Sequence, residues 1–252
     1  MAVRYETRDA VAYLTLDAPP LNILTCAMMD ELSAAVEKAA ADESLKAVAL
    51  AANGKAFSAG ADVGEHSPEE APRLIASFSR LFRGLGALDV PLVIAVDGAA
   101  LGAGFEVAMM ADVLLASERA KLGQPEIRLA FFAPVGVALL PALVGMPKAV
   151  EINCSGRTYT AAEMKEIGLV RRVLPPEGLA GAVEEILGDF RKASAAVMRL
   201  TRRTLRGLAG RPFEEARVLA ERIFLERLMK LEDVREGIGA FQEKRPPVWK
   251  DR

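Results

Sequence analysis

The sequence is poor in the residues that build disulfide frameworks, metal sites and histidine-dependent catalytic centres. It has two cysteines, Cys26 and Cys154, and a single histidine, His66. Two cysteines are too few for a disulfide framework, which favours a reducing, cytoplasmic location. Neither cysteine belongs to a cluster of His, Cys and acidic residues at metal-ligand spacing, so we expect neither a metal site nor a cysteine nucleophile.

The sequence also has little net charge and no apolar leader. A formal net charge of −2 gives no electrostatic reason to expect binding to nucleic acid or to an anionic membrane. The N-terminal residues are charged and contain no apolar run, so no secretory signal is expected. An uncharged stretch, residues 129–147, is interrupted by Pro134, Gly136, Pro141 and Gly145. We therefore expect a buried loop and helix there rather than a membrane span.

Small apolar residues are abundant and fall into alternating strand-like and helix-like segments. The composition is 52% hydrophobic but only 6% aromatic, which suits tightly packed α/β layers. Periodicity predicts two antiparallel strands within residues 3–17 and then alternating helices and strands. The helices are expected at 27–41, 68–87 and 102–111, and the strands at 45–52, 90–98 and 112–117. This alternation predicts an α/β layered core.

The pattern changes near residue 190, where long, charged and helically periodic segments replace the strands. We therefore divide the chain into a core of residues 1–189 and a C-terminal helical region of residues 190–252. The helical region carries an apolar stripe that either packs on the core or forms a subunit contact, and the pattern alone favours neither. The stripe consists of Leu219, Ile223, Phe224, Leu228 and Leu231.

Two glycine-rich turns, "FSAGAD" (57–62) and "ALGAGFE" (100–106), each follow an expected strand. Small residues there either permit a tight turn or expose backbone N–H groups that can stabilise a developing negative oxygen. Neither turn fits the dinucleotide motif G-x-G-x-x-G, and no Gly-Lys-Ser/Thr is present for a phosphate loop. Ser58 lacks a G-x-S-x-G context, and His66 lies eight residues further on. A serine–histidine mechanism is therefore not expected.

Two glutamates are candidates for acid–base chemistry. Glu106 is the only charged residue between Asp97 and Asp112. A carboxylate in such apolar surroundings is either paired in a structural salt bridge or tuned as a functional acid or base. Glu126 directly follows Pro125, which fixes the local backbone. It is either a surface glutamate beside Arg128 or the second member of an acid–base pair.

Four phrases together resemble the enoyl-CoA hydratase/isomerase (crotonase) superfamily. They are "GKAFSAGADV", "ALGAGFEVAMMADV", "GQPEIRL" and "EGIGAFQEKRPPVW", and the likeness covers nearly the whole chain. The resemblance implies an α/β fold, a spiral of ββα units followed by a C-terminal helical oligomerisation region. It also implies a homotrimer or homohexamer. An acyl-CoA thioester would be the substrate, with no separate cofactor, because coenzyme A enters with the acyl group.

The resemblance also implies a set of site residues. The oxyanion hole would come from the N–H groups of Ala61 and Ala103, although the family usually has glycine at the second position. Glu106 would act as the base towards water, and Glu126 would deliver a proton to the substrate carbon. Coenzyme A would contact Leu21, Ala59, Asp62, Val63, Phe241 and Lys244, the last two often from a neighbouring subunit.

The phrase "FFAPVGVALLP" (131–141) replaces the glycine-rich phrase of common hydratases. If Phe131, Phe132, Pro134 and Val135 line the acyl pocket, they suit a flat or cyclic acyl group. Together with "PPLNILT" and "DVGEH", this phrase is similar to the cyclohexa-1,5-diene-1-carbonyl-CoA hydratases of aromatic degradation. The alternatives are a short-chain enoyl-CoA hydratase of fatty-acid β-oxidation and an enoyl-CoA isomerase. Outside enzymes, an RNA-binding protein or a catalytically silent scaffold of this fold remains open.

Overall fold

The computed structural model describes residues 1–252, and its first element is the hairpin predicted from the alternating pattern. β1 (Val3–Arg8) and β2 (Val11–Leu16) pair antiparallel. Asp9 and Ala10 between them have φ of 48° and 58°, the left-handed values that a two-residue hairpin turn requires. From β2 the six-stranded sheet continues in parallel through β3 (Ala47–Ala52), β5 (Leu92–Val96), β7 (Val113–Ser117) and β10 (Arg172–Leu174).

A second, four-stranded sheet was not predicted from the sequence. Its strands, in spatial order, are β4 (Ala56–Ser58), β6 (Ala99–Leu101), β8 (Lys121–Gly123) and β9 (Thr158–Thr160). Each of β3, β5 and β7 in the large sheet is followed by one strand of the small sheet. A helix follows the first two of these pairs, α2 (Ala71–Ala87) and then α3 (Ala103–Met109). The expected spiral of ββα units is thus confirmed.

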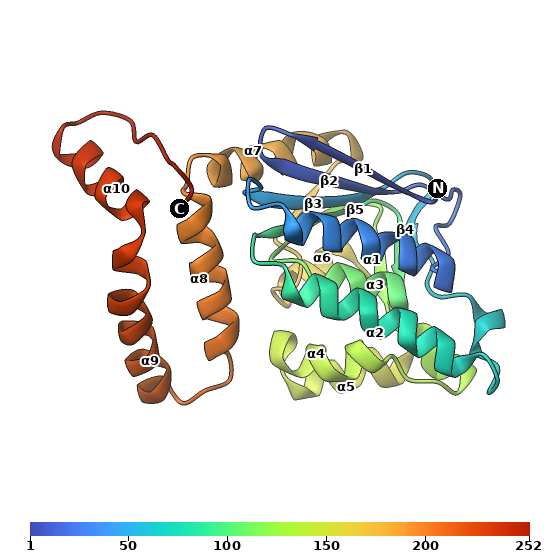
Figure 1. Ribbon diagram of the computed structural model, residues 1–252. Helices are drawn as coiled ribbons and strands as arrows, with labels where there is room; N and C mark the ends of the chain where they lie inside the picture. Colours follow the sequence, from blue (N-terminus) through green and yellow to red (C-terminus); the bar gives the residue numbers. More distant parts are fainter.

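Helices cover both faces of the large sheet. α1 (Cys26–Ala41) and α2 lie on one face and α7 (Leu179–Arg191) on the other, as Figure 1 shows. Leu50 and Ile94 belong to the main core cluster on the α1 side, whereas Ala49 and Val93 pack with Leu187 of α7. Successive strand residues point to opposite faces, so both must be apolar. That requirement explains the uninterrupted apolar runs of the central strands.

Residues 129–147 are largely exposed in the single chain, which corrects the expected burial. They form the end of the 3-10 helix η2 (Pro125–Leu129), then α4 (Pro134–Val144) and the start of α5 (Met146–Ser155). Within α4 only Gly136 and Leu140 are buried. Apolar composition predicted burial, but composition alone does not determine which side chains the fold covers. None of the helices combines the length and hydropathy needed to span a bilayer.

Beyond α7 the chain contains helices and no strand, as predicted, and it ends in a non-helical segment, residues 243–252. α8 (Ala195–Leu208) contacts the layered core through its arginines, among them Arg202, which pairs with Asp112 at 2.8 Å. α9 (Phe213–Glu226) and α10 (Glu232–Gln242) lie on the side of α8 that faces away from this core (Figure 1). The predicted apolar stripe does not pack on that core, and Phe224 is 51% exposed. Of the two interpretations of the stripe, a subunit contact therefore stays a prediction and packing on the core of the same chain is wrong.

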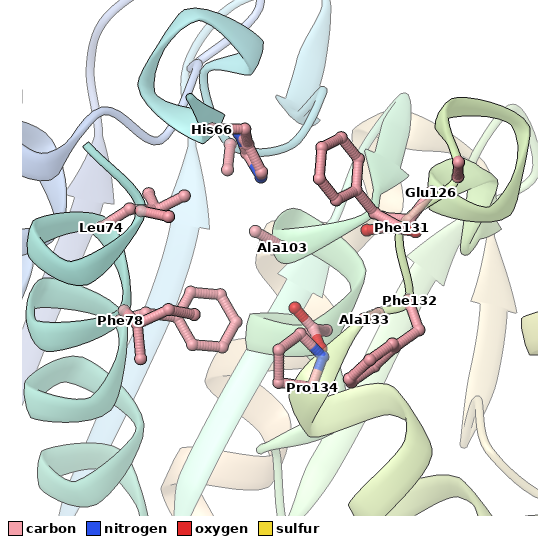
Figure 2. A pocket seen from close by; sticks show the side chains of 14 residues that line it. His66, Leu74, Phe78, Ala103, Glu126, Phe131, Phe132, Ala133 and Pro134 are labelled. Carbon is pink, nitrogen blue, oxygen red and sulfur yellow. The ribbon is translucent and has the colours of Figure 1, made fainter. Parts of the chain in front are cut away.

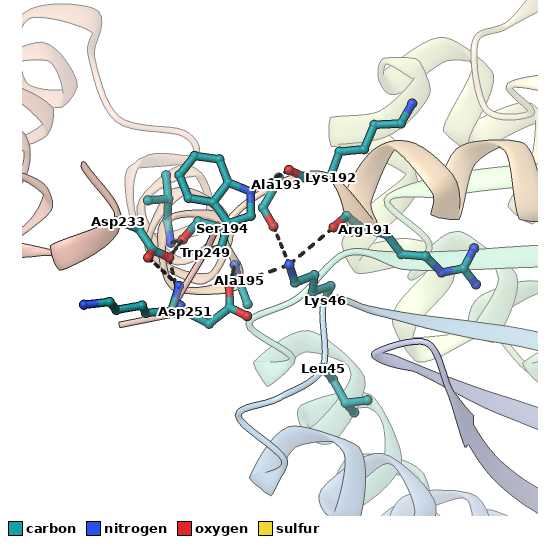
Figure 3. A network of polar contacts seen from close by, with 12 residues as sticks. Leu45, Lys46, Arg191, Lys192, Ala193, Ser194, Ala195, Asp233, Trp249 and Asp251 are labelled. Carbon is teal, nitrogen blue, oxygen red and sulfur yellow. Dashed lines mark hydrogen bonds and ion pairs between the residues drawn. The ribbon is translucent and has the colours of Figure 1, made fainter. Parts of the chain in front are cut away.

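A network of polar contacts joins the helical region to the core and to the C-terminus (Figure 3). The buried Asp233 accepts hydrogen bonds from the Ser194 hydroxyl at 2.5 Å and from the Asp251 amide at 2.9 Å. Asp251 in turn accepts the Ala195 amide at 2.7 Å. Lys46, in the turn before β3, donates to the Ala193 carbonyl at 2.9 Å. These contacts hold the first turn of α8 at a fixed place beside the sheet.

Candidate active site

One cavity of about 290 Å³ is enclosed by η1 (Val63–His66), α2, the start of α3, and the segment from η2 to α4. Figure 2 shows its walls: His66 above, Leu74 and Phe78 on one side, Phe131 and Phe132 on the other, and Pro134 below. The lining is mainly apolar, and both candidate glutamates belong to it. The full lining is Ala61, His66, Ala71, Leu74, Ile75, Phe78, Ala103, Glu106, Glu126, Ala130, Phe131, Phe132, Ala133 and Pro134.

Glu106 has no salt bridge, although it is only 1% exposed. Its Oε1 accepts hydrogen bonds from the backbone N–H groups of Val135 and Gly136, each at 2.7 Å. These N–H groups lie in the first turn of α4, where a helix leaves its amides without internal partners. Burial raises the pKa of Glu106 to about 7, opposed by the two N–H groups and assisted by the charge of Glu126. The carboxyl is therefore poised to exchange a proton near neutral pH.

Glu126 is half-buried beside the N-terminus of α3. A Cβ on Gly102 would collide with its Oε1, and Gly102 has φ of 53°, so the close approach depends on glycine. Gln124 can place its side-chain nitrogen towards Glu126, and this orientation satisfies the hydrogen bonding of both side chains. The nitrogen then lies 3.2 Å from Oε1 and 3.1 Å from Oε2 of Glu126. Burial raises the pKa of Glu126 as well. The interpretation of Glu126 as an ordinary surface residue is therefore wrong.

The two glycine-rich turns meet at the cavity. Leu24 forms a parallel β-bridge with Ala61. The Leu24 N–H donates to the Gly60 carbonyl at 2.9 Å, and the Leu24 carbonyl accepts the Asp62 N–H at 3.4 Å. The N–H of Ala61 lies between those two bonds and so points to the opposite side. Ala103 is the first residue of α3, where the N–H has no intrahelical partner. Two backbone donors of the required kind therefore border the cavity.

A second cavity of about 280 Å³ adjoins the first. Ala59 and Val63, two of the predicted coenzyme A contacts, line it, and Val63 is 61% exposed. Asp62 does not line it; its carboxylate accepts the Gly64 N–H at 2.7 Å and so fixes the start of η1. Leu21 lines neither cavity, but its carbonyl accepts the Ala59 N–H at 2.9 Å. Leu21 thus lies next to the opening.

Besides Leu21 and Asp62, three further predicted site residues line neither cavity within one chain. Val135 packs against the core and reaches the site only through its N–H group, because the chain turns into α4 at Pro134. Phe241, at 85% exposure, and Lys244 lie at the end of α10, which is remote from α2 and α4 in Figure 1. A contact from a neighbouring subunit stays a prediction for both.

Sequence reasoning missed several residues that the structure places at the site, and four of them shape it or add a polar group. Leu74 and Phe78 lie one turn apart on α2 and form one wall. Their spacing marks a buried helix face but not the cavity that this face borders. His66 was set aside because it is not adjacent to Ser58, yet it lines both cavities. Gln124 is buried beside Glu126, and no motif rule indicated it.

The comparisons with known proteins agree with this geometry. Residues 6–252 match the family described as "Enoyl-CoA hydratase/isomerase". The chain is similar to cyclohexa-1,5-dienecarbonyl-CoA hydratase of Thauera aromatica, with 35% identity over all of this chain and 97% of the relative. It is similar to a probable enoyl-CoA hydratase of Rhizobium meliloti, with 37% identity over 98% and 97%. The crystal structure of enoyl-CoA hydratase from Bacillus anthracis superposes with a TM-score of 0.94 at 26% identity and full coverage of both chains.

The α/β spiral and the match along the chain define the class of protein. The chain belongs to the enoyl-CoA hydratase/isomerase family. It is an enzyme of the enoyl-CoA hydratase type. The resemblance seen in the sequence phrases is therefore confirmed at the level of the family.

Proposed function

We propose that the protein adds water across a double bond conjugated to an acyl-CoA thioester, through a two-glutamate site and an oxyanion hole. The observation that carries the proposal is the shared cavity. Glu106, Glu126, Ala61 and Ala103 all line one apolar space of about 290 Å³. An apolar lining of this kind strengthens the electrostatic interactions of the few polar groups within it.

The proposed reaction needs one base, one acid and one oxyanion site. The carboxylate of Glu106 takes a proton from water as the oxygen of that water bonds to the conjugated carbon. Electron density moves to the thioester oxygen, which the N–H groups of Ala61 and Ala103 stabilise. Glu126 then gives its proton to the substrate carbon next to the thioester or further along the conjugated system. General acid–base catalysis contributes about 10²–10⁴-fold, and one oxyanion donor contributes about 10²–10³-fold.

The hydrogen bonds of Glu106 support its role as the base. Only Oε1 accepts the N–H groups of Val135 and Gly136, so Oε2 is available to a water molecule. A pKa of about 7 lets the same group hold a proton in one half of the cycle and release it in the other. The raised pKa of Glu126 supports its role as the proton donor.

We further propose a flat, cyclic dienoyl group as the acyl part, namely cyclohexa-1,5-diene-1-carbonyl-CoA. The rings of Phe78, Phe131, Phe132 and Pro134 surround the cavity (Figure 2). Planar walls accept a flat ring and resist a bending linear chain. The similarity to the Thauera aromatica hydratase supports the same substrate class.

The test is a side-by-side assay with crotonyl-CoA and cyclohexa-1,5-diene-1-carbonyl-CoA that separates hydrated from isomerised products. Clear preference for hydrating the ring substrate supports the proposal in full. Preference for crotonyl-CoA supports a short-chain hydratase of β-oxidation instead. Isomerised products without hydration, with both glutamates intact, overturn the hydratase proposal in favour of an isomerase.

We also propose that the helical region, residues 190–252, forms the contacts of a homotrimer or homohexamer. Exposed apolar side chains on α9, Val218, Phe224 and Leu225, are 55%, 51% and 67% exposed in the single chain. A second copy would bury them and bring Phe241 and Lys244 to a neighbouring site. Light scattering after size-exclusion chromatography tests the assembly, and a monomer at micromolar concentration overturns it.

A further inference from the structure

His66 stands where the two cavities join. Only Ala61, His66, Glu126 and Phe131 line both of them. Two of these four belong to the proposed chemistry, the oxyanion donor Ala61 and the carboxylate of Glu126. A thioester bound for that chemistry therefore lies at the junction, with its acyl group in one cavity and its coenzyme A arm in the other. His66 borders the same place.

The imidazole of His66 is held in one tautomer. Its Nδ1 lies 2.7 Å from the Asp62 carbonyl oxygen, and a carbonyl oxygen only accepts hydrogen bonds. Nδ1 must therefore carry the proton, which leaves Nε2 of the neutral ring as an acceptor. Nε2 makes no hydrogen bond to any protein group. The unused acceptor atom belongs to a ring that enters the cavity from above (Figure 2).

The position of the ring is fixed by its neighbours. It packs against Phe131 with ring centroids 5.2 Å apart and planes inclined by 51°, a favourable tilted arrangement. The segment that carries it is held to α1 by Glu65, whose carboxylate accepts the Cys26 amide at 2.8 Å. Apart from Glu106 and Glu126, His66 is the only polar side chain that lines the acyl cavity.

We propose that His66 is a substrate-positioning residue whose Nε2 accepts a hydrogen bond from an N–H or O–H donor of the bound thioester. The inference rests on the proposed function only in taking an acyl-CoA thioester as the ligand. Two groups of the bound thioester could donate this hydrogen bond near the junction of the two cavities. One is the amide N–H of the coenzyme A arm closest to the sulfur, and the other is a hydroxyl on the acyl group.

The test compares wild type with two variants that differ in the acceptor. His66→Phe keeps an aromatic ring against Phe131 but removes the acceptor, whereas His66→Gln keeps an acceptor oxygen. Binding of butyryl-CoA and 4-hydroxybutyryl-CoA is measured by calorimetry, because neither carries a conjugated double bond that could be hydrated. Loss of one hydrogen bond weakens binding by about 3- to 10-fold, and His66→Gln restores most of the affinity.

The ligands separate the two sources of the donor. If His66→Phe weakens both ligands equally, the coenzyme A amide is the donor; if it weakens only 4-hydroxybutyryl-CoA, the acyl hydroxyl is. Wild-type affinity of His66→Phe for both ligands overturns the inference. An equal loss in His66→Gln also overturns it, because the role is then structural. Wild-type protein that binds butyryl-CoA tightly but hydrates no substrate refutes the proposed reaction and leaves the His66 inference standing.

Discussion

Replacing Glu106 by Gln should stabilise the protein while it abolishes most of the activity. Burial raises the pKa of Glu106 from 4.5 to about 7. The unfolded chain therefore releases this proton near pH 4.5, whereas the folded protein keeps it until pH 7. The protonated Glu106 makes its full contribution to the free energy of unfolding below pH 4.5, and this contribution is lost as the pH rises to 7. At about 1.4 kcal/mol for each pH unit, the loss amounts to roughly 3 kcal/mol.

The Glu106→Gln variant avoids this loss, because an amide does not titrate and its oxygen can still accept the Val135 and Gly136 N–H groups. The free energy of unfolding of variant and wild type is measured by urea denaturation at pH 4.5 and at pH 8. The variant's advantage over wild type should be roughly 3 kcal/mol larger at pH 8 than at pH 4.5. The exposed Glu69→Gln serves as the matched control. A gain that is the same at both pH values would refute the reasoning.

The same substitution tests the proposed chemistry. We expect kcat to fall by about 10²–10⁴-fold, because the variant has no base for the water. In wild type, kcat/KM should rise with pH through an apparent pKa near the value of about 7 for Glu106. Near-normal turnover in the purified variant would exclude Glu106 as the base.

Three further substitutions test separate parts of the structure. Gly102→Ala forces a Cβ against Glu126 at a φ of 53°, so kcat should fall at least tenfold; unchanged kinetics would contradict the placement of that carboxylate. Phe132→Ala removes one planar wall of the acyl cavity and should lower the kcat/KM ratio of ring to linear substrate about tenfold; an unchanged ratio would remove Phe132 from the pocket. Asp233→Ala leaves the Ser194 hydroxyl and two backbone N–H groups without their acceptor. Stability should fall by about 2–4 kcal/mol in thermal denaturation, and an unaltered melting temperature would show that the network is not needed.

The core of the fold followed from the sequence because its strands are long and covered on both faces. A run such as residues 90–98 has few alternatives to a buried parallel strand. The small sheet could not be predicted in the same way. Its strands β4, β6, β8 and β9 are three residues each, too short for a period of two to be recognised. Tertiary pairing, not local pattern, makes them strands.

The site was predictable where a turn and its chemistry are contiguous in the chain. The two turns could be located because they follow the apolar runs of residues 45–52 and 90–98, whereas the choice of Ala61 and Ala103 within them came from the family resemblance. Glu126 was ambiguous, because its environment depends on Gly102 and Gln124, which only the folded chain brings alongside. His66 and Phe78 line the same cavity, and this too depends on contacts that only the folded chain makes. Val135 was misplaced because the sequence did not show that α4 begins at Pro134.

The way Glu106 is held explains why its surroundings suit a base that must change its protonation state. An arginine partner would have lowered the pKa of the buried carboxyl and kept it charged. The N–H groups of Val135 and Gly136 instead fix one oxygen and only partly offset the effect of burial. A carboxyl in this position is oriented yet nearly balanced between its two forms at neutral pH. At neutral pH the buried Glu106 lowers the free energy of unfolding, and the Glu106→Gln variant measures how large that decrease is.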